Sequence, residues 1–226
     1  MKNLVIAIDG PSGAGKGTLA RTLAERLGYR HVDTGAMYCA VAWQAAHSGV
    51  PLDDDEAVAR LALRVVLDQQ GGRVTIDGQD VTRAIRTPEI DQAAAAVAKL
   101  PHVRSVLVER QREMGAGGGV VMEGRDIGTV VFPGADVKIY LDATAEARAR
   151  RRASDEAHTG GRQASLANVQ SDLVARDTTD STRAVAPLAV AKDAIYVDTT
   201  AMPIEAVVNH AMKLVHEKLQ SSLTKL

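Results

Sequence analysis

Four glycines and one lysine lie close together near the start of the chain, in the segment GPSGAGKGT from Gly10 to Thr18. Glycines allow backbone N–H groups to converge on phosphate oxygens without interference from Cβ atoms, and a following helix N-terminus adds partial positive charge. In such a loop Lys16 would bridge the outer phosphates of ATP, and Thr18 would help to hold Mg²⁺. The spacing therefore predicts an ATP-binding loop made of Gly10, Pro11, Ser12, Gly13, Ala14, Gly15, Lys16, Gly17 and Thr18.

The residues on either side of this segment have the pattern that a phosphate-binding loop needs. Leu4 to Ile8 are apolar throughout, as in a parallel strand that is covered on both faces. After the loop a leucine recurs every fourth residue from Leu19 to Leu27, and Gly28 follows where a helix would end. The sequence thus predicts a strand, a glycine loop and a helix in direct succession.

Strand-like and helix-like segments alternate along most of the remaining chain. This alternation predicts one α/β domain over residues 1–226, with a mostly parallel sheet that binds ligands at the carboxyl ends of its strands. Further strands are expected at 31–33, 120–122, 137–141 and 194–197, and further helices at 36–47, 104–114 and 204–215.

Two regions differ from this alternation. Residues 53–100 contain an acidic opening, a helical stretch and the alternating segment RVTIDGQDV, which is typical of a small antiparallel hairpin in an inserted lobe. Residues 146–183 contain two charged helical stretches, 146–156 and 166–176, separated by HTGGRQ. We interpret this second region, which includes Arg162, as a hinged lid.

Composition excludes several classes of protein. With 226 residues, 46% of them hydrophobic, the chain can bury one sizeable core. A net charge of -1 and an aromatic content of 3% argue against a general nucleic-acid binder. The single Cys39 excludes an intramolecular disulfide, and the chain lacks an apolar run of the roughly 20 residues that span a bilayer. We therefore expect a cytoplasmic monomer without membrane or nucleic-acid partners.

Four sequence blocks resemble the nucleoside monophosphate kinases, and among them the bacterial cytidylate kinase family, over nearly the whole chain. In the first block Gly17 separates Lys16 from Thr18, where the strict phosphate-loop pattern has Ser or Thr directly after the lysine. The order and spacing of the blocks together are specific. The blocks are DGPSGAGKGT at 9–18, DTGAMY at 33–38, EGRDIGTVVFP at 123–133 and RDTTDSTRAVAPL at 176–188.

The resemblance implies a P-loop NTPase-type three-layer sandwich, in which 53–100 is an inserted NMP-binding lobe and 146–183 a small helical lid. It also implies transfer of the ATP γ-phosphoryl group to CMP or dCMP, with Mg²⁺, in pyrimidine nucleotide metabolism. Arg148 and Arg151 would approach ATP, and the catalytic charges would be Lys16, Arg151, Arg176 and Arg183. The implied CMP-binding residues are Thr34, Tyr38, Arg104, Glu123, Arg125, Asp126, Arg176, Asp180 and Arg183.

Two positions depart from the family pattern. Family members commonly carry arginine after the tyrosine of the second block, as a ligand for the acceptor phosphate, and here Cys39 stands in its place. Either another arginine takes over this contact or acceptor binding is weaker. Glu123 stands where relatives often have aspartate, within the same charge class.

The sequence leaves alternative functions open. The acceptor could instead be UMP, AMP or shikimate, which a product assay would separate. The phosphate loop could also belong to a nucleotide-dependent switch, although the chain lacks a clear guanine-reading NKxD motif. A basic DNA-binding module fits the balanced charge poorly.

Overall fold

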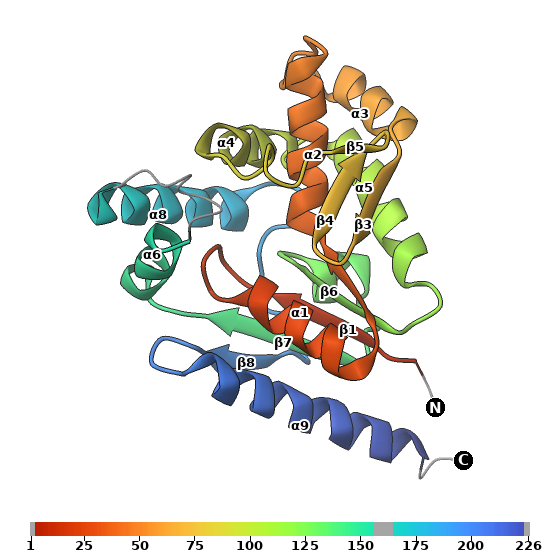
Figure 1. Cartoon of the computed structure of the whole chain (residues 1–226), viewed down its shortest axis with the longest axis vertical. Helices are drawn as coiled ribbons and strands as arrows, with labels where there is room; N and C mark the ends of the chain where they lie inside the picture. The colour runs from red at the N-terminus through yellow and green to blue at the C-terminus, as the bar shows by residue number, and fades with distance from the viewer. Residues whose placement is uncertain (1–2, 156–164, 224–226) are drawn as a thin grey trace.

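A five-stranded parallel sheet forms the centre of the molecule (Figure 1), in the strand order β2-β6-β1-β7-β8. The structure is a computed structural model that describes residues 3–155 and 165–223, so that Arg162 of the predicted lid lies outside the described residues. The mostly parallel sheet expected from the sequence is confirmed. Its strands are β1 (Val5–Asp9), β2 (Arg30–Asp33), β6 (Val120–Gly124), β7 (Val137–Asp142) and β8 (Ile195–Asp198).

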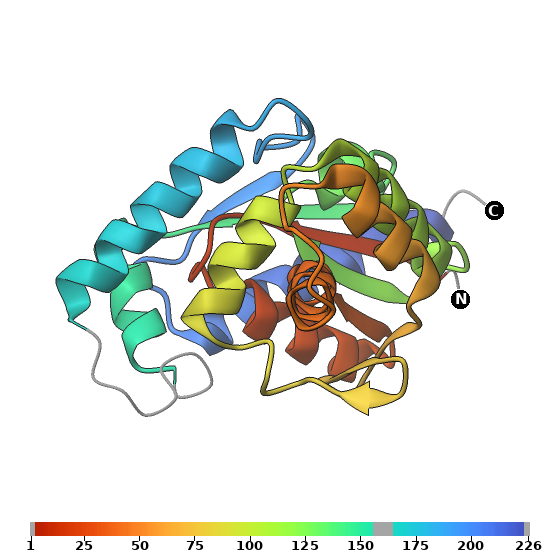
Figure 2. The ribbon, with the colours of Figure 1, turned by 90° about the horizontal axis from the view of Figure 1, so that it is seen from above.

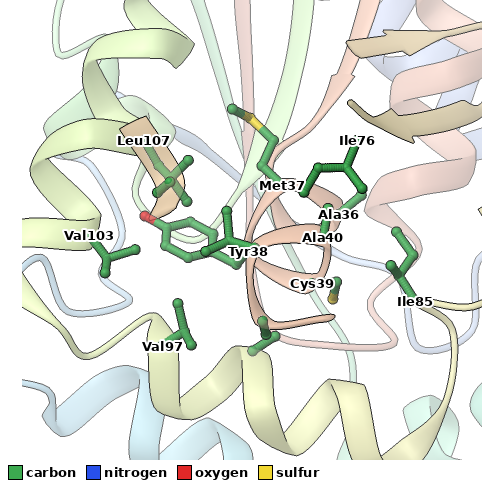
Figure 3. Close-up of a cluster of buried hydrophobic side chains, with 14 of the residues drawn as sticks. Ala36, Met37, Tyr38, Cys39, Ala40, Ile76, Ile85, Val97, Val103 and Leu107 are labelled. Atoms are coloured by element: carbon green, nitrogen blue, oxygen red, sulfur yellow. The ribbon is translucent and has the colours of Figure 1, made fainter. Parts of the chain in front are cut away.

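Helices cover both faces of this sheet and give the three layers of a P-loop α/β fold. On one face α1 (Lys16–Leu27) and α9 (Ile204–Leu223) bury Leu19, Leu23 and Val208 against the strands. On the other face α2 (Thr34–His47) and α5 (Pro101–Gly115) pack in a second apolar cluster, part of which is drawn in Figure 3. Helix α1 ends at Gly28 in the left-handed conformation, as predicted.

A small antiparallel sheet stands beside α2, and it has three strands where the sequence predicted a single hairpin. The hairpin itself is present, because Asp77 and Gly78 both adopt the positive φ values that a tight two-residue turn requires. The preceding segment adds the third strand. The elements of this region are α3 (Asp55–Arg64), β3 (Leu67–Gln70), β4 (Arg73–Ile76), β5 (Gln79–Asp80) and α4 (Pro88–Val97).

Helix α4 was not predicted from the sequence. Its start carries a recognisable signal, because the Thr87 side chain accepts a hydrogen bond from the Ile90 N–H and Pro88 occupies the first turn. An alanine-rich body with few large apolar residues gives little helical periodicity. Viewed from above in Figure 2, α4 lies between α2 and α8 (Leu166–Thr182).

Helix α8 packs on α6 (Ala145–Ala153), and it extends beyond the predicted end at residue 176. The added turn is rich in Thr, Ser and Asp, which are poor helix formers. The hydroxyls of Ser181 and Thr182 each donate to the carbonyl four residues earlier, over 2.7 Å, and the carbonyl of Asp180 accepts from the Leu188 N–H over 2.8 Å. Tertiary contacts, not apolar periodicity, hold this end of the helix, because the buried Asp180 pairs with Arg125.

One buried carboxylate fixes the edge of the sheet where the strands end. Asp9 closes β1 with 5% of its surface exposed, and it accepts hydrogen bonds from the N–H groups of Ile127 (2.8 Å) and Gly128 (2.7 Å). These two residues open the π-helical turn η1 (Ile127–Val131) that follows β6. Burial raises the pKa of Asp9 from 3.8 to about 6, although the two N–H donors oppose this.

This raised pKa predicts a specific pH dependence of stability. The favourable contribution of neutral Asp9 is complete below pH 3.8 and is lost as the pH rises through about 6. Relative to Asp9→Asn, the wild-type free energy of unfolding should therefore fall by up to about 3 kcal/mol between pH 4 and pH 8. Urea titrations of both proteins measure this difference, and a difference that is constant or rises with pH would contradict the assignment.

Candidate active site

The glycine-rich loop runs from the end of β1 to the start of α1, and its glycines are required by geometry. Gly10 has a φ of 144°, and a Cβ atom there would lie 2.0 Å from the Leu141 carbonyl oxygen. Gly15 has a φ of 96° at the position before α1, and no atom lies within 4 Å of where its Cβ would be. The loop therefore fits tightly against β7 on one side and is open above the helix N-terminus, where an anion would bind.

Lys16 lies within this loop with only 6% of its surface exposed. Its Nζ donates to the Pro11 carbonyl oxygen over 2.7 Å, so the side chain folds back along the loop. Burial, and after it the charge of Arg125, lower the pKa of Lys16 to about 7, although the carboxylates of Glu123 and Asp33 oppose this shift. Phosphate groups that bind next to Lys16 would bring negative charge and favour the protonated form of its side chain.

A cleft of about 1200 Å³ opens at the carboxyl ends of the strands. This volume exceeds the range of roughly 300–1,000 Å³ that is usual for one small ligand, so the cleft has room for two. It unites the loop with charged residues from β6, α6 and α8. Of the residues predicted from the sequence, the lining includes Ser12, Gly13, Ala14, Gly15, Lys16, Gly17, Thr18, Glu123, Arg125, Arg151 and Arg176.

Glu123 and Arg125 project from the carboxyl end of β6, where open α/β sheets bind ligands. The Glu123 carboxylate hydrogen-bonds His31 Nε2 over 3.0 Å, and its backbone oxygen accepts from the Thr34 hydroxyl over 2.7 Å. Arg125 Nε donates to Asp180 over 2.8 Å. Burial by itself would lower the pKa of Arg125, but the Asp180 carboxylate raises it above its ordinary value.

A second group of predicted residues is buried behind the cleft wall. Arg104 donates to the Asp126 carboxylate, and Arg183 Nη2 lies 3.5 Å from the other oxygen of Asp126. The Arg104 guanidinium also lies 5.7 Å from the centre of the Tyr38 ring. Figure 3 shows Tyr38 pointing from α2 toward Val103 of α5. Within the described ranges its hydroxyl is buried without a hydrogen-bond partner.

The two arginines predicted to approach ATP have different positions. Arg148 donates to the backbone oxygens of Ala143 (2.9 Å) and Ser12 (3.0 Å) and to Asp177 (2.6 Å). It is 5% exposed, so the structure places it as a support of the loop. Arg151 lines the cleft and donates from Nη1 to the Thr199 hydroxyl over 3.0 Å. The prediction of ATP contact therefore has more support for Arg151.

Several cleft residues were not singled out from the sequence. Arg86, in the connection before α4, pairs with Asp33 over 2.8 Å beside the buried Cys39. Asp91 on α4 faces Arg152 and Arg176. Asp33 had a local signal, because it directly precedes a helix and its side chain accepts from the Ala36 N–H over 2.9 Å. The position of Arg86 depends on the fold of the whole region, which no local pattern reveals.

The sheet order, the glycine loop before α1 and the buried lysine define this protein as one with a P-loop nucleotide-binding fold. A gluconokinase from Sinorhizobium meliloti 1021 has a similar fold, with a TM-score of 0.51 and 14% identity over 100% of this chain and 99% of that one. A sequence model of the cytidylate kinase family matches residues 6–217. The chain belongs to the cytidylate kinase family.

Two curated relatives cover nearly the whole chain. The cytidylate kinase of Desulfitobacterium hafniense (strain Y51) is 48% identical, over 99% of this chain and 97% of the relative. The cytidylate kinase of Solibacter usitatus (strain Ellin6076) is 47% identical, over 96% of this chain and 94% of the relative. Family membership thus extends across the loop, the cleft and the helices around it.

The lowered pKa of Lys16 predicts that ATP binding takes up a proton. At pH 8 the free side chain is mostly neutral, since its pKa is about 7, and bound phosphates favour the charged form. We expect uptake of up to about one proton per ATP bound at pH 8, and less at pH 6. Calorimetry in buffers of different ionisation enthalpy measures this number. Lys16→Arg, which stays charged, should show none, and a binding enthalpy independent of buffer in the wild type would contradict the prediction.

Proposed function

We propose that this chain transfers the γ-phosphoryl group of ATP to CMP or dCMP, giving ADP and CDP or dCDP. The observation that carries the proposal is the family match over residues 6–217, in a chain whose cleft unites a phosphate loop with several arginines. The cleft volume supports simultaneous binding of a donor and an acceptor nucleotide.

The donor phosphates would bind at the glycine loop. Backbone N–H groups at the start of α1 and the Lys16 ammonium supply positive charge there. Arg151 would add a second charge from α6, because it already lines the cleft next to the Ala14 carbonyl. Arg148 would act by holding the Ser12 carbonyl and thus the shape of the loop.

The acceptor would bind along the end of β6. Cytosine offers an amino donor and a carbonyl acceptor, which suit the guanidinium of Arg125 and the carboxylate of Asp126. Arg104 supports the orientation of Asp126, because the two side chains are paired and buried. The proposed acceptor site consists of Thr34, Tyr38, Arg104, Glu123, Arg125, Asp126, Arg176, Asp180 and Arg183.

The chemistry requires positioning and charge stabilisation and needs no protein nucleophile. An acceptor phosphate is already ionised, so that it attacks without a general base. As the phosphoryl group moves, negative charge spreads over its oxygens, and cations already in place lower the barrier. We assign this role to Lys16, Arg151 and Arg176, which line the cleft, and to Arg183 once bound nucleotides draw it out of its buried contact with Asp126.

The residues next to the loop fit a magnesium ion bound mainly through phosphates. Thr18 is exposed at the first turn of α1, and the Glu123 carboxylate lies near Gly17, 3.2 Å from where a Cβ would be. Among the described residues no group of three His, Cys, Asp or Glu side chains could hold a metal. Magnesium usually keeps waters and takes one or two protein ligands plus phosphates, and Thr18 would be such a ligand here. Bound there, the ion would neutralise phosphate charge.

The two regions that the sequence predicts to be lobes would form the outer walls of the proposed site. Residues 53–100 contribute Arg86 and Asp91 to the cleft, and the described part of 146–183 contributes Arg151, Arg152 and Arg176. We propose that these regions bind the acceptor and close over it, which would exclude water from the reaction. No helix within 3–155 or 165–223 is long and apolar enough to cross a membrane. The monomeric state and the cytoplasmic location stay predictions.

A coupled assay of ADP release, with ATP and magnesium, tests the proposed reaction. CMP and dCMP should stimulate release strongly, whereas UMP, AMP and shikimate should do so weakly. Lys16→Ala should lower turnover by about 100-fold or more, because it removes a charge used in the transition state, and its thermal unfolding should stay close to wild type. Equal stimulation by AMP and CMP would contradict the assigned acceptor, and near-normal turnover of Lys16→Ala would reject the role of Lys16.

A further inference from the structure

Asp91 projects from α4 into the cleft and contacts two helices that are far away in the sequence. Its carboxylate pairs with Arg152 of α6 through one oxygen, and the other oxygen lies 3.5 Å from Nη1 of Arg176 of α8. All three side chains are about one-fifth exposed, so this cluster is largely removed from solvent. Figure 1 shows α4 above α8 and α6 below it, and Asp91 therefore connects three separate elements.

The Asp91 carboxylate contacts two arginines of the cleft wall at once. Arg86 and Arg125 have their own partners, Asp33 and Asp180. Arg176 holds Asp91 only at 3.5 Å, and its Nε is buried without a partner in the described part of the chain. Arg176 thus retains capacity to donate to an anion.

A carboxylate between two guanidinium groups occupies the type of position that a phosphate group would take. We propose that Asp91 is a latch, which ties α6 and α8 to α4 when no nucleotide is bound and which competes with the acceptor phosphate for Arg176. The inference that Asp91 ties the three helices together depends only on the ion pairs. The competition rests on the proposed function, because it requires a phosphate-bearing acceptor at Arg176.

The latch can be tested without any substrate by replacing Asp91 with its neutral isostere. Asp91→Asn removes the charge and keeps the size, and Asp53→Asn makes the same change at an exposed position outside the cleft, ahead of α3. In the nucleotide-free protein, amide hydrogen exchange in 145–153 and 166–182 should be about fivefold faster in Asp91→Asn than in wild type. Asp53→Asn should match wild type. Unchanged exchange in Asp91→Asn would overturn the latch.

The competition is tested by steady-state kinetics with CMP. Asp91→Asn should lower the KM for CMP by about fivefold, since the acceptor phosphate no longer displaces a carboxylate. We expect kcat and the KM for ATP to stay within about twofold of wild type. A KM for CMP that is unchanged or raised would overturn the competition. If the wild type does not phosphorylate CMP at all, the proposed function fails, while hydrogen exchange still decides on the latch.

A second variant approaches the same contact from α6. Arg152→Gln removes one arm of the latch and leaves Asp91 next to Arg176, so exchange in 145–153 should rise as in Asp91→Asn. Because Asp91 then pairs with Arg176 alone, the KM for CMP should not fall. A fall in KM equal to that of Asp91→Asn would contradict competition for Arg176.

Discussion

Positive charge crowded into a partly buried cleft is the constraint on which this structure depends. A guanidinium withdrawn from water is costly unless a carboxylate and hydrogen bonds compensate it. The cleft and the layer behind its wall contain several such groups, and carboxylates compensate many of them while the ligand is away. The pairs that do this are Arg86–Asp33, Arg104–Asp126, Arg125–Asp180, Arg148–Asp177 and Arg152–Asp91.

These pairs also connect elements that the chain order keeps apart. Arg125, directly after β6, meets Asp180 near the end of α8, and Arg148 of α6 meets Asp177 while holding the loop carbonyl of Ser12. Asp9 joins β1 to the turn after β6 through two backbone donors. The glycine-loop side and the β6 side of the cleft are therefore parts of one network, and the edge of the sheet holds its inner members in place.

Local patterns predicted the parts of the fold that depend on local chemistry. Glycines at a strand end, leucines at helical spacing and a helix-ending Gly28 were sufficient for β1, the loop and α1. The alanine-rich α4 and the last turn of α8 were missed, because side-chain caps and tertiary packing hold them. Most of the site residues were predicted from the resemblance to the family. Carboxylates that are distant in the sequence determine whether an arginine lines the cleft or lies behind it. The spacing of residues along the chain does not show these pairings.

A crystal structure of the complex with CMP would test most directly whether arginines held in advance by carboxylates form the acceptor site. We expect CMP to lie at the end of β6, in contact with Arg125, while Arg104 stays paired with Asp126 and Arg125 stays paired with Asp180. Their guanidinium groups should move by no more than about 1 Å from the positions described above. CMP bound elsewhere, or bound only after both ion pairs have broken, would contradict it.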